Sequence, residues 1–314
     1  KILFIKNNMP KVFDKTDCFI STIEYMNFKL CGEYVTDPTN AAIRQLFNIK
    51  TNTWDSEVLS VLGINEKRLP KVVPIGSEVG NLTKKAADEL GLSENVKVYC
   101  GAHDQYCAAL GCGAINPGDM LLATGTTWVV LGVTKSLLYT PSHISPGIHP
   151  VNGAFGAMAS LVSAGSSMKW YKNLIEGDFN LIDKEAEKRI NSAAELYFFP
   201  YLVGAGFPHN RPDLHGSIMG LEIRHDKYDI ALALMEGVAF EAKQVLREFS
   251  AQGMNISSLM MTGGAARSEL WSSIVGYVTG CEIYRMQEPE TCSVGAAMIA
   301  AVGAGMFSSY SECG

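Results

Sequence analysis

A junction between an apolar strand and a glycine turn constrains the fold of this chain most, because it occurs three times. The glycines of these turns are Gly101, Gly125 and the pair Gly263–Gly264. A residue without a Cβ atom lets a ligand come close to the backbone, whose exposed N–H groups can bind phosphate. Each turn could instead serve only to pack the chain tightly, so the pattern alone leaves both interpretations open.

From residue 96 onward, strand-like and helix-like patterns alternate, which indicates an α/β fold. The predicted strands are 96–100, 120–123, 128–133, 196–199 and 259–262. The predicted helices are 105–111, 228–249, 268–279 and 293–305, and three prolines predict a loop over 141–153. Residues 1–95 are expected to be mostly helical and rich in loops, with helices over 18–30, 54–62 and 84–90.

The charge balance argues against a nucleic-acid-binding protein, since 26 Lys and Arg against 32 Asp and Glu give a net charge of −6. A content of 47% hydrophobic and 18% charged residues is typical of a globular chain. No apolar run approaches the roughly 20 residues that a membrane helix needs. The eight cysteines show neither Cys-x-x-Cys pairs nor zinc-binding spacing, so we expect buried thiols in a reducing cytoplasm.

Several catalytic and phosphate-binding motifs do not occur in the sequence. There is no Gly-x-x-x-x-Gly-Lys-Ser/Thr loop and no Gly-x-Gly-x-x-Gly after a strand, which argues against ordinary P-loop NTPases and Rossmann dehydrogenases. There is also no His-Glu-x-x-His motif and no Gly-x-Ser-x-Gly elbow, so the sequence argues against an α/β hydrolase.

Asp104 is the candidate catalytic residue, because it lies where the strand and the Gly101 turn give way to a helix. The helix macrodipole keeps a carboxylate in this position ionised. An ionised carboxylate can accept a proton from a substrate hydroxyl during phosphoryl transfer. Aspartate is also a preferred helix N-cap, so Asp104 taken by itself could be a capping residue without a catalytic role.

Longer motifs show a resemblance to a known family. Residues 216–221, followed after seven residues by 229–236, fit the long second signature of the FGGY family of carbohydrate kinases. Residues 1–8 resemble its first signature, with Phe4 in place of the usual Trp, and 30–37 resemble its Leu-Thr-Gly-Glu-Tyr stretch. The resemblance covers essentially the whole chain and is nearest to the xylulokinase-like members. The loop 204–208 lacks the Glu-Arg pair of many members, which leaves the identity of the sugar open.

The resemblance implies roles for individual residues. Asp104 falls where the family has its catalytic base, and it belongs with His103 and Gln105 to the implied sugar-binding residues, although His103 could be only a turn residue. The implied ATP-binding residues are Gly125, Thr126, Thr127, Gly165, Gly263, Gly264 and Ala265. The resemblance implies no metal ligand among the protein's own residues.

The resemblance also implies an α/β fold of the actin-like ATPase (ribonuclease H-like) type with two lobes, the first one incomplete. Residues 1–114 would be the second half of the N-terminal lobe, and 115–314 would be the C-terminal, nucleotide-binding lobe. The implied reaction is phosphorylation of a hydroxyl of a ketose such as xylulose, or of a related polyol, with ATP and Mg²⁺. The family's Asp-x-Gly-Thr loop does not occur, so we expect a chain truncated at both ends with little or no activity alone.

An alternative from another functional class stays open, namely a non-catalytic nucleotide- or sugar-binding module derived from such a kinase. For either function we expect a small-molecule sugar as the partner, and neither nucleic acid nor membrane. We further expect a cytoplasmic location, with a homodimer as the candidate assembly.

Overall fold

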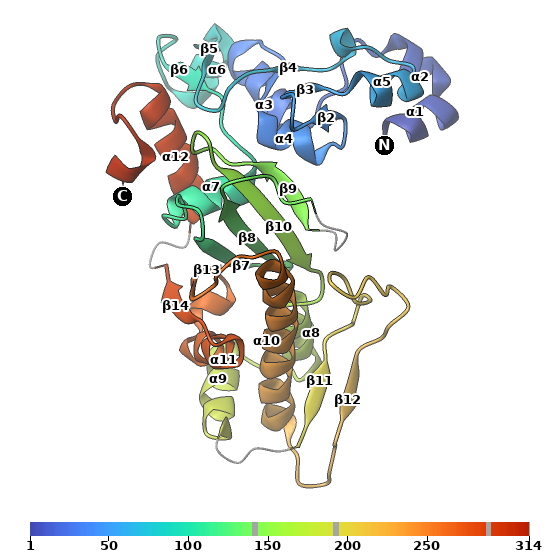
Figure 1. Ribbon diagram of the computed structural model, residues 1–314, viewed down its shortest axis with the longest axis vertical. Helices are drawn as coiled ribbons and strands as arrows, with labels where there is room; N and C mark the ends of the chain where they lie inside the picture. Colours follow the sequence, from blue (N-terminus) through green and yellow to red (C-terminus); the bar gives the residue numbers. More distant parts are fainter. Residues whose placement is uncertain (140–143, 191–194, 287–289, 314) are drawn as a thin grey trace. The chain divides into compact units, whose positions relative to one another are not determined.

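The computed structural model describes residues 1–139, 144–190, 195–286 and 290–313, and the chain forms two compact units (Figure 1). Unit 1 consists of Lys1–Cys107, Gly147–Asn152 and Ser293–Gly314. Unit 2 consists of Ala108–Pro146 and Gly153–Cys292. The chain therefore passes from one unit to the other four times, so neither unit is one continuous stretch of sequence. The expected boundary at residue 114, between the N-terminal and the C-terminal lobe, stays a prediction.

A six-stranded mixed sheet, in the order β14-β13-β7-β8-β10-β9, is the centre of unit 2. Its strands are β7 (Met120–Thr124), β8 (Trp128–Thr134), β9 (Ser145–Ile148), β10 (Phe155–Leu161), β13 (Ser258–Gly263) and β14 (Glu282–Arg285). β7, β8 and β10 pair antiparallel, whereas β13 runs parallel to both β7 and β14. The parallel pairing brings the ends of β7 and β13 together, with Thr124 opposite Gly263.

The strand β8 shows why the sheet lies in the core, since it is a nearly continuous apolar run and is buried along its whole length. Four helices of unit 2 pack around the sheet and one another: α8 (Gly165–Leu174), α9 (Phe179–Glu187), α10 (Lys227–Ala251) and α11 (Glu269–Thr279). Figure 1 shows α10 beside α8 and β11 (Tyr197–Phe199), which pairs antiparallel with β12 (Ser217–Met219).

The helix α10 begins with a capping box, in which Asp226 accepts from the N–H groups of Tyr228 and Asp229 while Asp229 accepts from Asp226 N. Its core-facing side chains, including Val238, Val245 and the fully buried Phe249, follow a helical period. The predicted helix over 228–249 is therefore confirmed.

Unit 1 is built from short elements. Its helices are α1 (Ile2–Asn8), α2 (Pro10–Lys15), α3 (Thr22–Cys31), α4 (Pro38–Ile43), α5 (Ser56–Leu62), α6 (Lys84–Leu90), most of α12 (Thr291–Gly303) and the first turn of α7 (Asp104–Gly111). Its strands are β1 (Val35–Thr36), β2 (Phe47–Asn48), β3 (Thr53–Trp54), β4 (Lys71–Val72), β5 (Glu78–Asn81) and β6 (Lys97–Tyr99). Aromatic side chains form much of its core, where Phe47 and Trp54 meet edge to face with ring centroids 5.6 Å apart.

The loop predicted over 141–153 is wrong in part, because β9 occupies Ser145–Ile148. Residues 140–143 lie outside the described residues. Pro146 can belong to a strand here because β9 lies at one edge of the sheet. An edge strand tolerates the missing N–H group of proline. The helices α1 and α2 and the strand β10 were not predicted.

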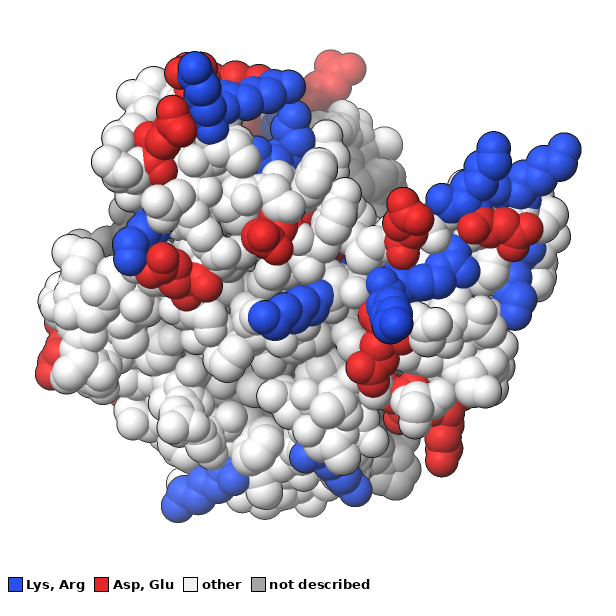
Figure 2. Space-filling view, turned by 90° about the horizontal axis from the view of Figure 1, so that it is seen from above, with Lys and Arg blue, Asp and Glu red and all other residues white. Residues whose placement is uncertain are grey.

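On the face of the molecule seen in Figure 2, basic and acidic side chains lie close to one another. None of the helices in the described part of the chain has the length and apolarity to cross a membrane. Burial raises the pKa of the Cys100 thiol to about 12, so this cysteine is an unreactive core residue, as the sequence predicted.

Candidate functional site

Asp104 begins the helix α7, at the corner where the chain leaves β6 and the Gly101 turn. Its carboxylate Oδ1 accepts from Gln105 N at 2.7 Å, and His103 Nδ1 lies 3.0 Å from the same oxygen. An N-cap carboxylate would accept from N–H groups two or three residues further on. Asp104 is thus a first-turn residue paired with His103, and its side chain is 65% exposed to solvent.

The imidazole of His103 holds the pKa of the Asp104 carboxyl below its ordinary value, mainly by hydrogen bonding to the ionised form. Burial opposes this effect, and the N–H of Gln105 adds to it. Gln105 N lies 2.7 Å from the carboxylate oxygen and 3.4 Å from His103 Nδ1, so the carboxylate is its closer acceptor. The result is an ionised and accessible carboxylate, as a general base requires.

The third implied sugar-binding residue, Gln105, presents a buried oxygen. Its Oε1 has no hydrogen-bond partner among the described residues. A buried acceptor without a donor is costly unless a ligand or water supplies one. His103, Asp104 and Gln105 therefore form one continuous polar corner in unit 1.

The implied ATP-binding residues lie together in unit 2, around the ends of β7 and β13. Gly264 N donates to Thr124 O at 2.9 Å, and Ala265 N donates to Thr124 Oγ1 at 3.1 Å. Ser166 N donates to Thr126 O at 2.9 Å, which ties the start of α8 to the β7–β8 turn. Gly125, Thr126 and Thr127 are exposed at this turn, where a phosphate could reach their N–H groups.

Two of these glycines are required by the geometry of the turns. A Cβ atom on Gly165 would lie 2.1 Å from Gly125 O, so only glycine lets the two backbones approach this closely. Gly263 has a φ of +95° and would place a Cβ atom 2.9 Å from Thr124. Both glycines serve packing, and that packing assembles the exposed turn.

The sequence analysis missed Thr124, which joins the turns. It is buried, its hydroxyl donates to Thr262 O at 2.6 Å, and the same oxygen accepts from Ala265 N and Ala266 N. The signal available was a lone threonine at the end of an apolar strand, directly before the turn glycine. The predicted helix over 268–279 is confirmed as α11 with its N-cap Ser268, and a single 3-10 turn, η3 (Ala265–Arg267), lies between Gly264 and that helix.

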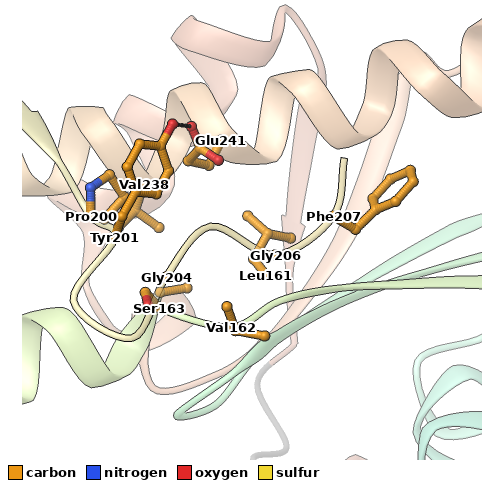
Figure 3. A pocket seen from close by; sticks show the side chains of 11 residues that line it. Leu161, Val162, Ser163, Pro200, Tyr201, Gly204, Gly206, Phe207, Val238 and Glu241 are labelled. Atoms are coloured by element: carbon orange, nitrogen blue, oxygen red, sulfur yellow. Dashed lines mark hydrogen bonds between the residues drawn. The ribbon is translucent and has the colours of Figure 1, made fainter. Parts of the chain in front are cut away.

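A hollow lies beside this turn in unit 2, between the end of β10, the loop 200–207 and α10 (Figure 3). Tyr201 Oη donates to Glu241 Oε1 at 2.8 Å across it, and His209 Nε2 lies 3.4 Å from the other carboxylate oxygen. A larger cavity of about 360 Å³ adjoins the same pair, and burial raises the pKa of Glu236 on its wall. Ser163 and Ala164 line the first hollow, directly before Gly165.

No group of three or more His, Cys, Asp or Glu side chains suited to hold a metal ion occurs in the described part of the chain. A Mg²⁺ ion that arrives with a nucleotide needs only one or two protein carboxylates besides the phosphates and water. A nucleotide-borne ion therefore does not require such a group of side chains.

Two family models together match most of the sequence. The C-terminal domain of the FGGY family of carbohydrate kinases matches residues 120–304, and the N-terminal domain of that family matches residues 1–111. A xylulose kinase of Staphylococcus epidermidis is 30% identical over 100% of this chain and 64% of its own length. A xylulose kinase of Bacillus subtilis is 28% identical over 100% of this chain and 63% of its own length. The chain thus spans less than two thirds of these relatives.

Solved structures agree with the sequence comparison. A xyloylose kinase from Brucella ovis superposes with a TM-score of 0.92 at 26% identity, over 99% of this chain and 65% of the other. A ligand-bound xylulose kinase from Lactobacillus acidophilus gives 0.89 at 25% identity, over 100% and 64%. A glycerol kinase from Plasmodium falciparum, solved with ADP, shares the fold with a TM-score of 0.90 at 22% identity, over 99% and 64%. The fold is the actin-like ATPase fold, and the chain belongs to the FGGY family of carbohydrate kinases.

Proposed function

We propose that this chain carries the catalytic base and the nucleotide-binding turns of an ATP-dependent sugar kinase. The observation that carries the proposal is the exposed turn assembled by Thr124, where Gly125–Thr127, Gly165 and Gly263–Ala265 converge. The second support is Asp104, an accessible carboxylate whose pKa is lowered by His103.

In the proposed reaction, Asp104 accepts the proton of a sugar hydroxyl while that oxygen attacks the γ-phosphorus of ATP. A bond forms between the sugar oxygen and phosphorus, and the bond from phosphorus to the oxygen bridging to ADP breaks. The N–H groups of Gly125–Thr127 would hold the phosphates, and Gly263–Ala265 would hold the adenosine. Mg²⁺, when bound with the nucleotide, neutralises part of the phosphate charge.

The acceptor in this proposal is a ketose such as xylulose, or a related polyol. The names of the relatives support a ketose, since the two compared above are xylulose kinases. The buried oxygen of Gln105, next to Asp104, supports a ligand that offers a hydroxyl donor.

The proposal extends to the organisation and setting of the protein. It divides the chain at residue 114 into an N-terminal and a nucleotide-binding part, and it places the protein in the cytoplasm. The exposed apolar side chains of Tyr197 and Met219, paired across β11 and β12, support a homodimer, which sedimentation velocity would detect.

The test is an assay of ADP release by the full-length protein that contains this chain, with a panel of ketoses and polyols, combined with calorimetric titration of ATP and of each sugar. Sugar-dependent ADP release supports the kinase. Binding of nucleotide or sugar without turnover under all conditions supports the alternative, a non-catalytic binding module. Absence of nucleotide binding contradicts the kinase, and absence of both nucleotide and sugar binding contradicts both functions.

A further inference from the structure

The loop that carries Asp104 is anchored by a residue far away in sequence. Thr39, the second residue of α4, is 1% exposed, and its Oγ1 accepts a hydrogen bond from His103 N at 2.7 Å. The two residues are 64 positions apart in the chain. The bond fixes the backbone directly before the proposed base.

The hydroxyl of Thr39 is itself oriented by Asp37, which is fully buried. The Thr39 hydroxyl donates a hydrogen bond to Asp37 Oδ1, and Thr39 N donates to the same oxygen at 2.8 Å. Asn40 Nδ2 donates to Oδ2 at 2.5 Å and keeps the carboxylate in place. Because a hydroxyl has one proton, its use on Asp37 leaves an oxygen lone pair for His103 N.

This anchor lies between two regular segments. The end of β6 is held by the bond from Cys100 N to Ser77 O, and α7 begins with Tyr106 N and Cys107 N donating to His103 O. In the stretch 101–103 between them, Thr39 Oγ1 holds His103 N, and Cys107 Sγ donates to Ala102 O at 3.4 Å. A continuous series of bonds thus runs from Asp37 through Thr39 and His103 to the carboxylate of Asp104.

We propose that Asp37 and Thr39 are positioning residues that hold His103 and Asp104 in the geometry needed for proton transfer, an inference that rests on the proposed function. Helix capping does not account for the arrangement. Asp37 is the N-cap of α4, but a cap needs only the bonds to Thr39 N and Asn40 N. The bond from Thr39 Oγ1 to residue 103 adds nothing to the cap and acts only on the loop.

The test replaces Thr39 by Val, which keeps the shape but removes the hydroxyl, and by Ser, which keeps the hydroxyl. Thr134→Val is the matched control, because Thr134 is also a buried threonine whose hydroxyl donates one bond, to Ser136 O. Two NMR readouts need no enzyme turnover: hydrogen exchange of the His103 amide, and the pKa of the Asp104 carboxyl followed by its carbon resonance.

With Thr39→Val, we expect faster exchange of the His103 amide and a higher pKa of Asp104, because the imidazole is no longer held against the carboxylate. Thr39→Ser should restore both values, and Thr134→Val should change neither. In the sugar-kinase assay of the full-length protein, Thr39→Val should lower kcat about 10- to 100-fold with an unchanged KM for ATP, as expected for misplaced catalytic groups.

The proposal is overturned if Thr39→Val folds and leaves the pKa of Asp104 unchanged. Should that variant not fold, the unmodified protein decides, since fast exchange of its His103 amide would equally overturn the anchor. The proposed function fails separately. A raised pKa of Asp104 in the Thr39→Val variant, together with no sugar phosphorylation by the unmodified full-length protein, would keep the anchor and reject the kinase.

Discussion

At the scale of single residues, the charge of Asp104 depends on its neighbour. His103 donates to the carboxylate from 3.0 Å and lowers its pKa, and the side chain stays largely exposed. Thr124 has a comparable role in unit 2, where one hydroxyl joins the ends of two strands and the η3 turn. The hydrogen bonds of Asp104 and of Thr124 each depend on one side chain. A substitution that keeps the side-chain volume can therefore remove them.

In the full-length protein, Asp104→Asn should lower sugar phosphorylation by roughly 100- to 10,000-fold, because the amide cannot accept the hydroxyl proton. ATP affinity should change little, since the proposed nucleotide-binding residues are other ones. ADP release and calorimetry measure the two quantities, with the exposed Asp88→Asn on α6 as the control. Near-normal turnover in the Asp104 variant would show that another group is the base.

His103→Ala should raise the pKa of Asp104, because it removes the main hydrogen bond that lowers it. A base is active above its pKa and loses activity as the pH falls through that pKa. The acid limb of kcat/KM should therefore move to higher pH in the variant. An unchanged pH profile would contradict the assigned hydrogen bond.

At the scale of elements, the ends of helices and strands carry the function. The start of α8 lies against the β7–β8 turn through the close approach of Gly165 to Gly125. In unit 1, the start of α3 carries a capping box formed by Ser21 and Glu24, and Arg44 pairs with the fully buried Glu24. Each arrangement predicts a specific effect on stability.

Gly165→Ala should destabilise unit 2 and weaken ATP binding, because the new Cβ atom would lie 2.1 Å from Gly125 O and the backbone must move. Gly80→Ala in β5 is the control, since its Cβ would meet Cys31 Cβ at an ordinary 3.5 Å. Urea unfolding and calorimetry measure both effects. Unchanged ATP affinity in a destabilised Gly165 variant would remove this glycine from the nucleotide site.

Glu24→Gln should lower the free energy of unfolding by about 3 kcal/mol, since it leaves the guanidinium of Arg44 without its buried partner. Burial alone would raise the pKa of Glu24, but the hydrogen bonds from Ser21 and the charge of Arg44 bring it below 4.5. Its contribution to stability is thus present above pH 4.5 and is lost as the pH falls through the lowered pKa. The variant should show a weaker loss of stability in acid.

The matched control for this variant is Glu78→Gln, which breaks the exposed pair with Lys97 and should leave the urea midpoint unchanged. Equal effects of the two substitutions would mean that burial of the Glu24–Arg44 pair has no energetic role.

The elements that could be predicted from sequence are those with a strong local signal. The helix α10 has a long apolar period, and α5 and α6 end at the expected glycines, Gly63 and Gly91. The strand β10, Phe155–Leu161, was missed because small residues interrupt its apolar alternation. The two-residue strands β1 to β4 are too short for any period and form only through tertiary pairing.

For the candidate site, too, only the features with a local sequence signal could be predicted. Glycine turns and Asp104 are recognisable from local sequence, because each follows an apolar strand. The bonds from Thr39 to His103 and from Thr124 to Ala265 join residues 64 and 141 positions apart, and no local pattern reports such a pairing.

At the scale of the whole molecule, two units share the proposed functions, with the Asp104 corner in unit 1 and the nucleotide-binding turns in unit 2. A non-hydrolysable ATP analogue should slow hydrogen exchange at 124–127, around 165 and at 263–265. At 100 times its Kd, it should stabilise the native state by about 2.7 kcal/mol. Protection confined to unit 1 would contradict the proposed nucleotide site.

The interleaving of the two units has a consequence for folding during synthesis. Residues 1–107 are translated before the residues from Ser293 onward, which unit 1 also needs. At roughly 5–20 residues per second, the 186 residues from 107 to 293 take about 10–40 s to translate. Until then Gly76 and Cys107 lack the partners on α12, Gly303 and Gly295, that approach them closely. Unit 2 can close before that helix is finished, so residues 1–107 stay without part of their own unit for this time.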